Sequence, residues 1–305
     1  MVRPGIAALL AILPVLVPAQ TTHGRSPVRF KTAVDVVQLN VSVTDGNHRY
    51  VTGLGERDFA VFEDGRRQAV SFFSDTGAPL SLALLIDGSA SMDQNLPFAQ
   101  DAAVRFVGAM GPRDLARVTQ FNERVTVLQD FTSDQGALEG AIRRTQAAGA
   151  TALYTALYVT LREMRAPDHA AEARRRAVVL LSDGEDTGSA VGEDQVLELA
   201  RRADVTIYPI ALRSRSRATV VPGPTAHFLA RLARDTGGEV HYPTALTDLK
   251  GVYSRIADDL RTQYTLGYVS ANPVRDGSWR QISVRTPSRD NLFIRYRLGY
   301  YAPRG

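Results

Sequence analysis

The most restrictive feature of the sequence is an apolar run, Leu80 to Ile86, that ends directly at a polar loop. Such a run is typical of a strand buried on both faces, as in the centre of a parallel sheet. A second run of this kind spans Val178 to Ser182, and patterns typical of helices lie between the two. Parallel strands need helical crossovers, so this alternation predicts an α/β domain over residues 79–262 with a doubly wound, Rossmann-like, mainly parallel sheet.

The alternation of strand and helix patterns continues through the whole of this domain. We expect its strands at 80–86, 116–121, 125–128, 178–182, 205–211 and 239–242. We expect its helices at 97–110, 135–145, 151–164, 194–203, 227–236 and 246–262.

Both ends of the chain have β character instead, because β-branched residues alternate with polar ones there. The expected strands lie at 34–44, at 59–73 as two strands joined by Asp64-Gly65, and at 264–269, 279–286 and 292–300. We therefore expect an N-terminal β segment at 29–78 and a C-terminal β segment at 263–305. Pairing of the two would hide the apolar face and the edge of each, which predicts a small β-sandwich or sheet.

The first residues have the pattern of a secretory signal. Arg3 is followed by an apolar run over 5–17, and Val17-Pro18-Ala19 has the form of a signal-peptidase site. The alternative is a membrane anchor, but the run is shorter than the roughly 20 residues of a spanning helix and Pro14 interrupts it. We expect a signal peptide at 1–19, a linker at 20–28, and an exported chain, periplasmic or secreted, without a transmembrane segment.

Composition excludes several other classes of protein. The chain has no cysteine, so disulfides and lipid attachment through cysteine are excluded. Its stability must come from core burial, to which a bound metal could add. The net charge of +4 arises from 36 basic and 32 acidic residues. So small an excess does not call for a nucleic-acid partner.

Polar side chains follow the two buried runs. Asp87, Ser89 and Ser91 come directly after the first run, and Asp183 comes directly after the second. In open α/β sheets, ligands bind at these carboxyl ends of the strands. Thr151 opens the helix between the two runs, where it could equally be only an N-cap. Carboxylate and hydroxyl oxygens suit Mg²⁺, Mn²⁺ or Ca²⁺ rather than zinc or copper.

These pieces, in this order, resemble the metal-ion-dependent adhesion site of von Willebrand factor type A domains. That family has Asp-x-Ser-x-Ser, then a threonine in a later loop, then an aspartate after the next core strand. The pattern falls without a gap on Asp87, Ser89, Ser91, Thr151 and Asp183. The resemblance spans about Leu80 to Thr262, and flanking stretches such as LRTQYTLGYVS and RLGYYAP are similar to those of a bacterial family of exported von Willebrand factor A-related proteins.

The resemblance implies a function as well as a fold. By analogy with the adhesion site of that family, Ser89 and Ser91 are expected to bind the ion directly, while Thr151, Asp87 and Asp183 are expected to bind it directly or through water. A partner's Asp or Glu carboxylate replaces one bound water. The resemblance therefore implies a non-enzymatic binding or adhesion module without catalytic residues. Mg²⁺ is the ion that we expect first.

Three alternatives stay open at this point. The polar residues could only cap helices and satisfy loops, with no metal. A metal-assisted hydrolase or phosphatase could use Asp87 as nucleophile, but Ser89 stands where haloacid-dehalogenase-like enzymes need a second acid, and no Walker-type loop or Gly-x-Ser-x-Gly elbow occurs. The ion could also be purely structural, in an assembly factor whose β segments make the contacts.

Two neighbouring features complete the expectations for this end of the sheet. Glu185 and Asp186 follow Asp183 and are expected to be solvated or to lie around the ion without binding it. The loop after the strand at 205–211 carries Arg213, Arg215 and Arg217. It is either a solvated loop or a basic surface that favours an acidic partner.

Overall fold

The computed structural model describes residues 36–76, 78–165, 174–212 and 223–305. The predicted signal peptide and linker lie outside these residues, and so do Arg213, Arg215 and Arg217.

A five-stranded sheet forms the centre of the α/β domain. Its order is β7 (Val125–Thr132), β6 (Leu115–Phe121), β5 (Leu80–Asp87), β8 (Arg175–Ser182) and β9 (Thr206–Ala211). The strands β6, β5, β8 and β9 are parallel, and only β7 at the edge is antiparallel to its neighbour. This confirms the predicted doubly wound, mainly parallel sheet.

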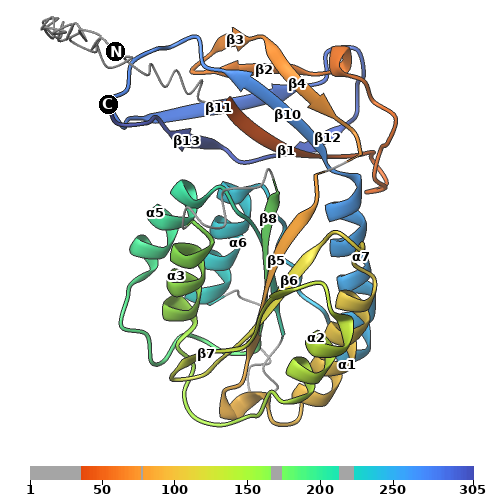
Figure 1. Ribbon diagram of the computed structural model, residues 1–305, viewed down its shortest axis with the longest axis vertical. Coiled ribbons are helices and arrows are strands. Elements are labelled where there is room, and N and C mark those ends of the chain that lie inside the picture. The colour runs from red at the N-terminus through yellow and green to blue at the C-terminus, as the bar shows by residue number, and fades with distance from the viewer. Residues whose placement is uncertain (1–35, 77, 166–173, 213–222) are drawn as a thin grey trace, which may run out of the picture. The chain divides into compact units, whose positions relative to one another are not determined.

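Helices cover both faces of this sheet (Figure 1). They are α1 (Leu96–Gly108), α2 (Gln135–Arg143), α3 (Leu153–Met164), α5 (Glu193–Ala203), α6 (Pro224–Thr236) and α7 (Leu249–Thr262). On β5, Leu82, Leu84 and Ile86 face the core under α1, α2 and α7, whereas Ala83 and Leu85 face the core under α3, α5 and α6. Both faces of β5 are therefore buried, as the apolar run predicts.

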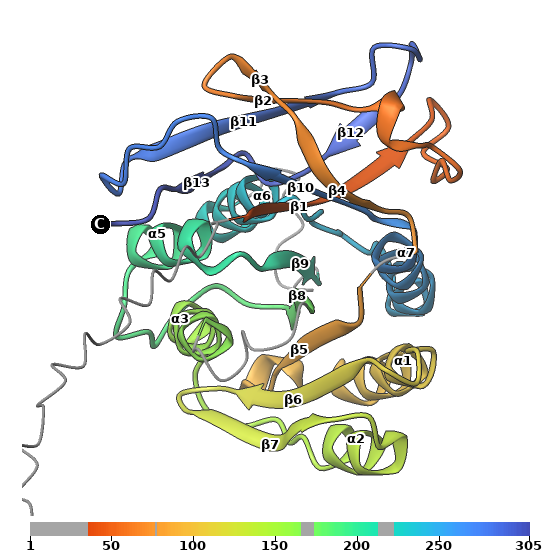
Figure 2. The same cartoon turned by 45° about the horizontal axis from the view of Figure 1, so that its top comes forward.

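The ends of the chain build two further sheets, which Figure 2 shows as separate layers. One contains β12 (Phe293–Arg295), β1 (Val36–Thr44), β10 (Tyr264–Val269) and β4 (Val70–Ser74); the other contains β13 (Gly299–Tyr301), β11 (Trp279–Arg285), β2 (Ala60–Glu63) and β3 (Arg66–Gln68). N-terminal and C-terminal strands pair in both sheets. One core joins their inner faces, so the predicted β-sandwich is confirmed.

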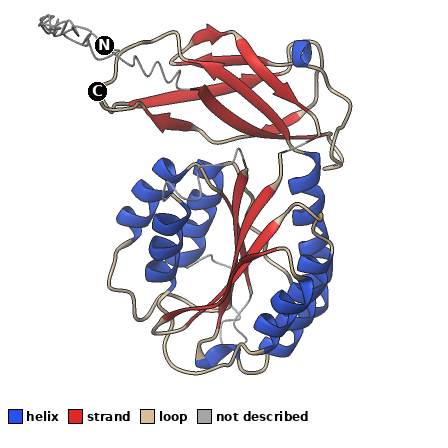
Figure 3. Cartoon of the chain, in the orientation of Figure 1, coloured by secondary structure: helices blue, strands red, loops and turns tan. Residues whose placement is uncertain are grey.

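Short 3₁₀ turns complete the described elements, at Glu56–Asp58, Ala90–Met92 and Leu246–Asp248. Figure 3 shows the long helices gathered around the central sheet. Among the described residues, none of the helices has the length and apolar character that crossing a membrane requires.

Three expected strands differ from the structure. The stretch 239–242 forms only an isolated bridge, between His241 and Ile210, so the sheet ends at β9. The stretch 292–300 is split into β12 and β13, which belong to different sheets. The stretch 59–73 contains the predicted hairpin of β2 and β3, but the chain then crosses at Ala69 into the other sheet as β4. A local alternation pattern does not show where a chain changes sheets.

Candidate functional site

The candidate site lies where the order of the sheet reverses. From β5 the chain continues to β6 and β7 on one side, and it then returns to β8 on the other side of β5. The loops after β5 and β8 therefore lie next to each other at the carboxyl ends of two neighbouring parallel strands, where ligands bind in open α/β sheets. Asp87 is the last residue of β5, and Asp183 directly follows β8.

The Asp87 carboxylate is completely buried, and both of its oxygens accept hydrogen bonds. The backbone N–H of Ser89 donates to Oδ1 at 2.8 Å, and the hydroxyl of Ser182 donates to Oδ2 at 2.5 Å. Burial is the largest influence on this group and raises the pKa of Asp87; the bonds from Ser182 and Ser89 oppose the rise, and the charge of Asp183 adds to it. The carboxylate is thus held firmly at the end of β5.

The loop after β5 curls so that its hydroxyls meet Asp183. A 3₁₀ turn at Ala90–Met92 brings the Ser89 and Ser91 hydroxyls to 3.0 Å from each other. Ser91 Oγ donates to Oδ1 of Asp183 at 2.7 Å, and Asn95 Nδ2 donates to Oδ2 of Asp183 at 2.9 Å. Three of the predicted ligands therefore form one chain of contacts.

Thr151 approaches the same point, because Gly184 leaves room for it. A Cβ at Gly184 would lie 3.3 Å from Thr151 Oγ1 and 3.8 Å from Ser91 Oγ. Thr151 itself is buried. The three loops that carry the five predicted residues thus converge, and the missing side chain at Gly184 makes this close approach possible.

The N-cap interpretation of Thr151 is wrong. Helix α3 begins at Leu153, its cap position is Ala152, and no side chain caps it from that position. The backbone N–H groups of Tyr154 and Thr155 instead donate to the side chains of Asp186 and Ser189, in the loop after β8. The Thr151 hydroxyl is therefore not engaged in helix capping.

The loop after β8 engages Asp186 in hydrogen bonds close to the predicted ligands. Its carboxylate accepts from Tyr154 N at 3.1 Å and from the Ser189 hydroxyl at 2.5 Å. The Thr187 hydroxyl accepts from the backbone N–H of Thr151 at 3.0 Å. Asp186 and Thr187 hence anchor the start of α3 and the loop before it, and so position Thr151.

Sequence reasoning missed Asn95, Ser182 and Gly184. Ser182 is adjacent to Asp183, so its proximity to the site could have been inferred from the chain order. Asn95 follows Ser91 by four residues, but nothing in the spacing shows that it bonds to Asp183. Gly184 could have been suspected only because glycines occur where other chain segments approach closely.

The donor set of two carboxylates and three hydroxyls fits a hard divalent cation. Oxygen donors suit Mg²⁺, Mn²⁺ and Ca²⁺, whereas zinc sites use His and Cys as well. In the part of the chain that the structure describes, no three His, Cys, Asp or Glu side chains gather around a possible metal position. Any ion held here would depend on the hydroxyl oxygens.

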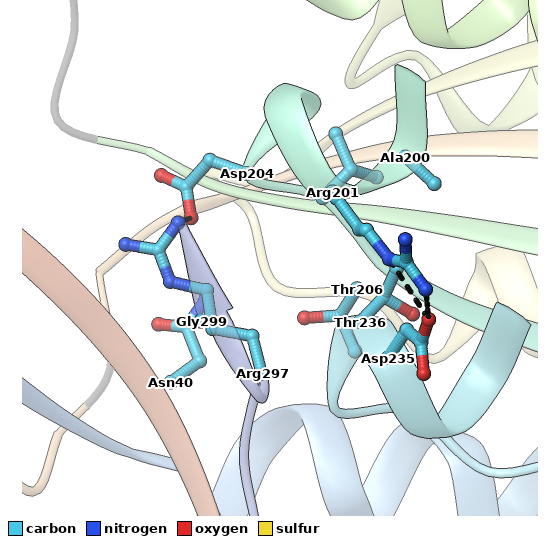
Figure 4. A pocket seen from close by; sticks show the side chains of 10 residues that line it. Asn40, Ala200, Arg201, Asp204, Thr206, Asp235, Thr236, Arg297 and Gly299 are labelled. Atoms are coloured by element: carbon cyan, nitrogen blue, oxygen red, sulfur yellow. Dashed lines mark hydrogen bonds and ion pairs between the residues drawn. The ribbon is translucent and has the colours of Figure 1, made fainter. Parts of the chain in front are cut away.

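Another pocket, at the opposite end of the central sheet, is not a comparable site (Figure 4). It lies at the start of β9 and has a volume of about 10 Å³. The charged side chains that line it are paired with each other: Arg201 donates to Asp235 at 2.7 Å, and Arg297 lies 2.9 Å from Asp204. Such a volume has room for about one water molecule.

Comparison with known proteins bears on the fold. Residues 82–185 match the family model of the von Willebrand factor type A domain, and this segment includes all five predicted ligands. A von Willebrand factor type A structure from Catenulispora acidiphila is 12% identical, covers 90% of this chain and 75% of its own, and has a TM-score of 0.52. That similarity therefore extends beyond the α/β domain into the β segments.

Two further structures match the chain less completely. The vWF domain of the type V pili tip protein Mfa5 from Porphyromonas gingivalis is 15% identical, with 60% of this chain and 95% of that chain covered and a TM-score of 0.47. Proximal thread matrix protein 1 from the mussel byssus, with a zinc-occupied MIDAS motif, is 19% identical, with 64% and 48% covered and a TM-score of 0.49. No curated protein matches the sequence.

Proposed function

We propose, from the premise that the chain contains a von Willebrand factor type A domain, that its candidate site holds a divalent cation and docks a partner protein. Asp87, Ser89, Ser91, Thr151 and Asp183 would hold the ion, with Mg²⁺ as the first expectation and Mn²⁺ or Ca²⁺ as the next. The observation that carries the proposal is the contact of the Ser89, Ser91 and Asp183 oxygens at the point where the sheet order reverses. The protein is then a non-enzymatic binding module.

The donor set also indicates the chemistry of the partner. The Asp183 carboxylate contacts the serine hydroxyls directly. Both oxygens of Asp87 already accept hydrogen bonds, so Asp87 would stabilise the ion through its charge or through a bridging water. When bound, the ion supplies a positive centre with exchangeable water positions. An Asp or Glu carboxylate of a partner protein presents both the oxygen and the negative charge that suit such a centre.

The geometry argues against the hydrolase alternative. Asp87 is the nucleophile in that hypothesis, and a nucleophile must reach the reacting atom of its substrate. The Asp87 side chain is 0% exposed, and both oxygens are occupied by the Ser89 backbone and the Ser182 hydroxyl. A substrate would have to displace these contacts before any attack.

The proposal is tested by titrating Mg²⁺ and Mn²⁺ into metal-free protein of residues 20–305 in a calorimeter. The wild type is expected to bind, and a Ser89→Ala, Ser91→Ala double variant is expected to lose binding. A Ser71→Ala, Ser288→Ala double variant, which changes two exposed serines outside the α/β domain, serves as the control and should bind like the wild type. Absence of binding to the wild type would refute the metal site.

A second measurement separates docking from a purely structural ion. Asp183→Ala should abolish metal-dependent capture of a partner by the immobilised protein and leave the melting temperature of the metal-free chain nearly unchanged. If the ion only stabilises the fold, addition of Mg²⁺ should raise the melting temperature of the wild type but not that of Asp183→Ala. In that case no carboxylate-bearing partner should be captured.

We also infer export from the signal pattern at 1–19, since Arg3, the apolar run and Val17-Pro18-Ala19 follow the expected order. Expression in a bacterium with a secretory pathway, followed by mass measurement of the intact product, tests this. The expected mature protein begins at Gln20. A membrane-retained product that still carries Met1 would favour the anchor alternative.

A further inference from the structure

Helices α1 and α7 lie side by side on one face of the central sheet (Figure 1). A groove between them is lined by residues of both helices. Its main cavity has a volume of about 120 Å³. A smaller cavity of about 30 Å³ continues it and shares Phe106, Ala109, Ala257 and Arg261 with it. We call this pair of cavities the α1–α7 groove.

Small side chains explain why the groove is open. Ala102 of α1 and Ala109, which caps its C-terminus, line the groove together with Ser254 and Ala257 of α7, so neither helix fills the space between them. The floor is aromatic: Phe106 and Tyr253 are buried, and their ring centroids are 5.0 Å apart. An aromatic floor of this kind favours contact with another ring.

The walls of the groove are positively charged. Arg105 and Lys250 line the main cavity, and neither has an ion-pair partner among the described residues. Arg261 lies 3.7 Å from Asp258, the one carboxylate that lines the same cavity. The smaller cavity adds Arg175 and Asp114, one charge of each sign. Over the whole groove four cations thus face two carboxylates, which leaves two positive charges for a ligand to neutralise.

We propose that the α1–α7 groove binds a small aromatic carboxylate, independently of the metal site. Its ring would lie against Phe106 and Tyr253, and its carboxylate would accept charge-assisted hydrogen bonds from Arg105 and Lys250. Together the two cavities are about as large as a dry cavity of about 150 Å³ that holds benzene in another protein, so they accommodate the ring, and the carboxylate would lie at the exposed Arg105 and Lys250. A peptide segment needs far more room than the groove offers.

An uncharged apolar ligand fits the groove less well than a carboxylate. It would lie beside the exposed Arg105 and Lys250 without giving either a partner, whereas a carboxylate accepts a charge-assisted hydrogen bond from both. A carboxylate without a ring would leave the apolar floor in water. The combination of ring and negative charge therefore distinguishes this ligand class from both.

To test the proposal, benzoate, benzamide and acetate are each titrated into the full chain. Binding is monitored by NMR through the chemical shifts of the backbone amides. EDTA is present throughout, and the Ser89→Ala, Ser91→Ala variant is titrated in parallel, so that benzoate at the metal site cannot give the signal. We expect benzoate to shift amides of α1 and α7 and to bind about tenfold more tightly than benzamide. Acetate is expected to produce no such shifts.

Two kinds of variant make the test specific. Ala257→Leu should fill the groove and abolish binding of both aromatic ligands. The double variant Arg105→Gln, Lys250→Gln should weaken benzoate about tenfold and leave benzamide unchanged. A double variant of two exposed arginines in the β2–β3 hairpin, Arg66→Gln and Arg67→Gln, is the charge-matched control and should bind as the wild type does.

Equal affinity for benzoate and benzamide, or shifts confined to the ends of β5 and β8, would overturn the proposal. If Ala257→Leu fails to fold, the Arg105→Gln, Lys250→Gln variant tests the proposal instead, because exposed charged side chains can be replaced without disturbing the packing of the core. Failure of the metal titration leaves this proposal untouched, since its measurements exclude metal.

Discussion

At the scale of single residues, the molecule contains buried polar groups of two kinds. Most are paired: Asp87 and Thr236, for example, have hydrogen-bond partners. A few are not, and Tyr253 is one of these, since its hydroxyl has no partner among the described residues. Burial raises the pKa of Tyr253, so the group is a neutral, unsatisfied hydroxyl at neutral pH.

Tyr253→Phe is accordingly expected to stabilise the protein by about 1 kcal/mol, because it removes an unpaired buried hydroxyl and keeps the ring against Phe106. Equilibrium unfolding in urea measures this. Tyr264→Phe is the matched control: the Tyr264 hydroxyl donates to Val51 O and accepts from Leu54 N, so its removal should destabilise. A loss of stability in both variants would contradict the prediction.

Gly184 gives a second prediction at this scale. A methyl group there would lie 3.3 Å from Thr151 Oγ1, which is closer than ordinary contact, so Gly184→Ala should push the converging loops apart. We expect Mg²⁺ binding to weaken by about tenfold with little change in melting temperature. In Gly188→Ala the nearest atom is 3.6 Å away, an ordinary contact, and calorimetric affinity should stay at the wild-type value.

At the scale of elements, charged side chains connect the C-terminal β segment to the α/β domain. Arg295 of β12 donates to Asp259 of α7 and to Glu239 at 2.7 Å. Tyr208 of β9 also donates to Asp259, at 2.9 Å. Asp259 is 1% exposed, so its charge depends on these neighbours.

Loss of Arg295 should therefore be costly, and the cost should depend on pH. Burial raises the pKa of Asp259, and the charge of Arg295 opposes that rise. A raised folded-state pKa means that the contribution of Asp259 to stability is complete at low pH and declines as the pH rises through that pKa. Without Arg295 the rise in pKa is larger, so the loss of stability is larger and extends to higher pH.

We expect Arg295→Gln to lower the free energy of unfolding by about 3 kcal/mol near neutral pH and by clearly less at about pH 4.5. Urea unfolding at the two pH values measures this difference. Arg289→Gln removes a half-exposed arginine 3.9 Å from Asp58 and should cost less than about 1 kcal/mol at either pH. An Arg295→Gln effect that is the same at both pH values would contradict the explanation.

Much of the element order could be predicted from the sequence, and the reasons are local. The runs that became β5 and β8 are apolar on both faces, and the helices have one apolar face. The split between β12 and β13 and the crossing from β3 to β4 could not be predicted, because they depend on which distant strand is available for pairing. The contacts Asn95 to Asp183 and Asp186 to Tyr154 join different loops, so no spacing along the chain reveals them.

At the scale of the whole molecule, the two ends of the described chain share one hydrophobic core. Leu39 of β1 is completely buried and lies opposite Leu266 of β10, far away in the sequence. The inner face of β11 contributes Ile282 and Val284 to the same core. Neither terminal segment could bury its apolar face without the other.

Leu39→Ala should consequently cost about 2–5 kcal/mol and weaken both terminal segments together. Hydrogen exchange is the measurement: amide protection should fall in β1, β10 and β11 and stay nearly constant in β5 and β8. Leu84→Ala, in the core under α1 and α7, is the converse control and should lower protection in β5 and β8. Protection lost in β1 alone would contradict a shared core.

The pairing of β4 with β10 has a consequence for how the chain folds. Ser74 and Thr265 are Cα partners in this pair, so the α/β domain occupies the place of a hairpin loop between two neighbouring strands. Closing such a long loop from an unfolded chain is slow, because the entropy of the intervening residues must be lost before the contact forms. Once the α/β domain has folded, β4 and β10 emerge close together and only a short closure remains. During synthesis β1, β2 and β4 leave the ribosome before the α/β domain, whereas β10 and β11, with which they pair, leave it only afterwards.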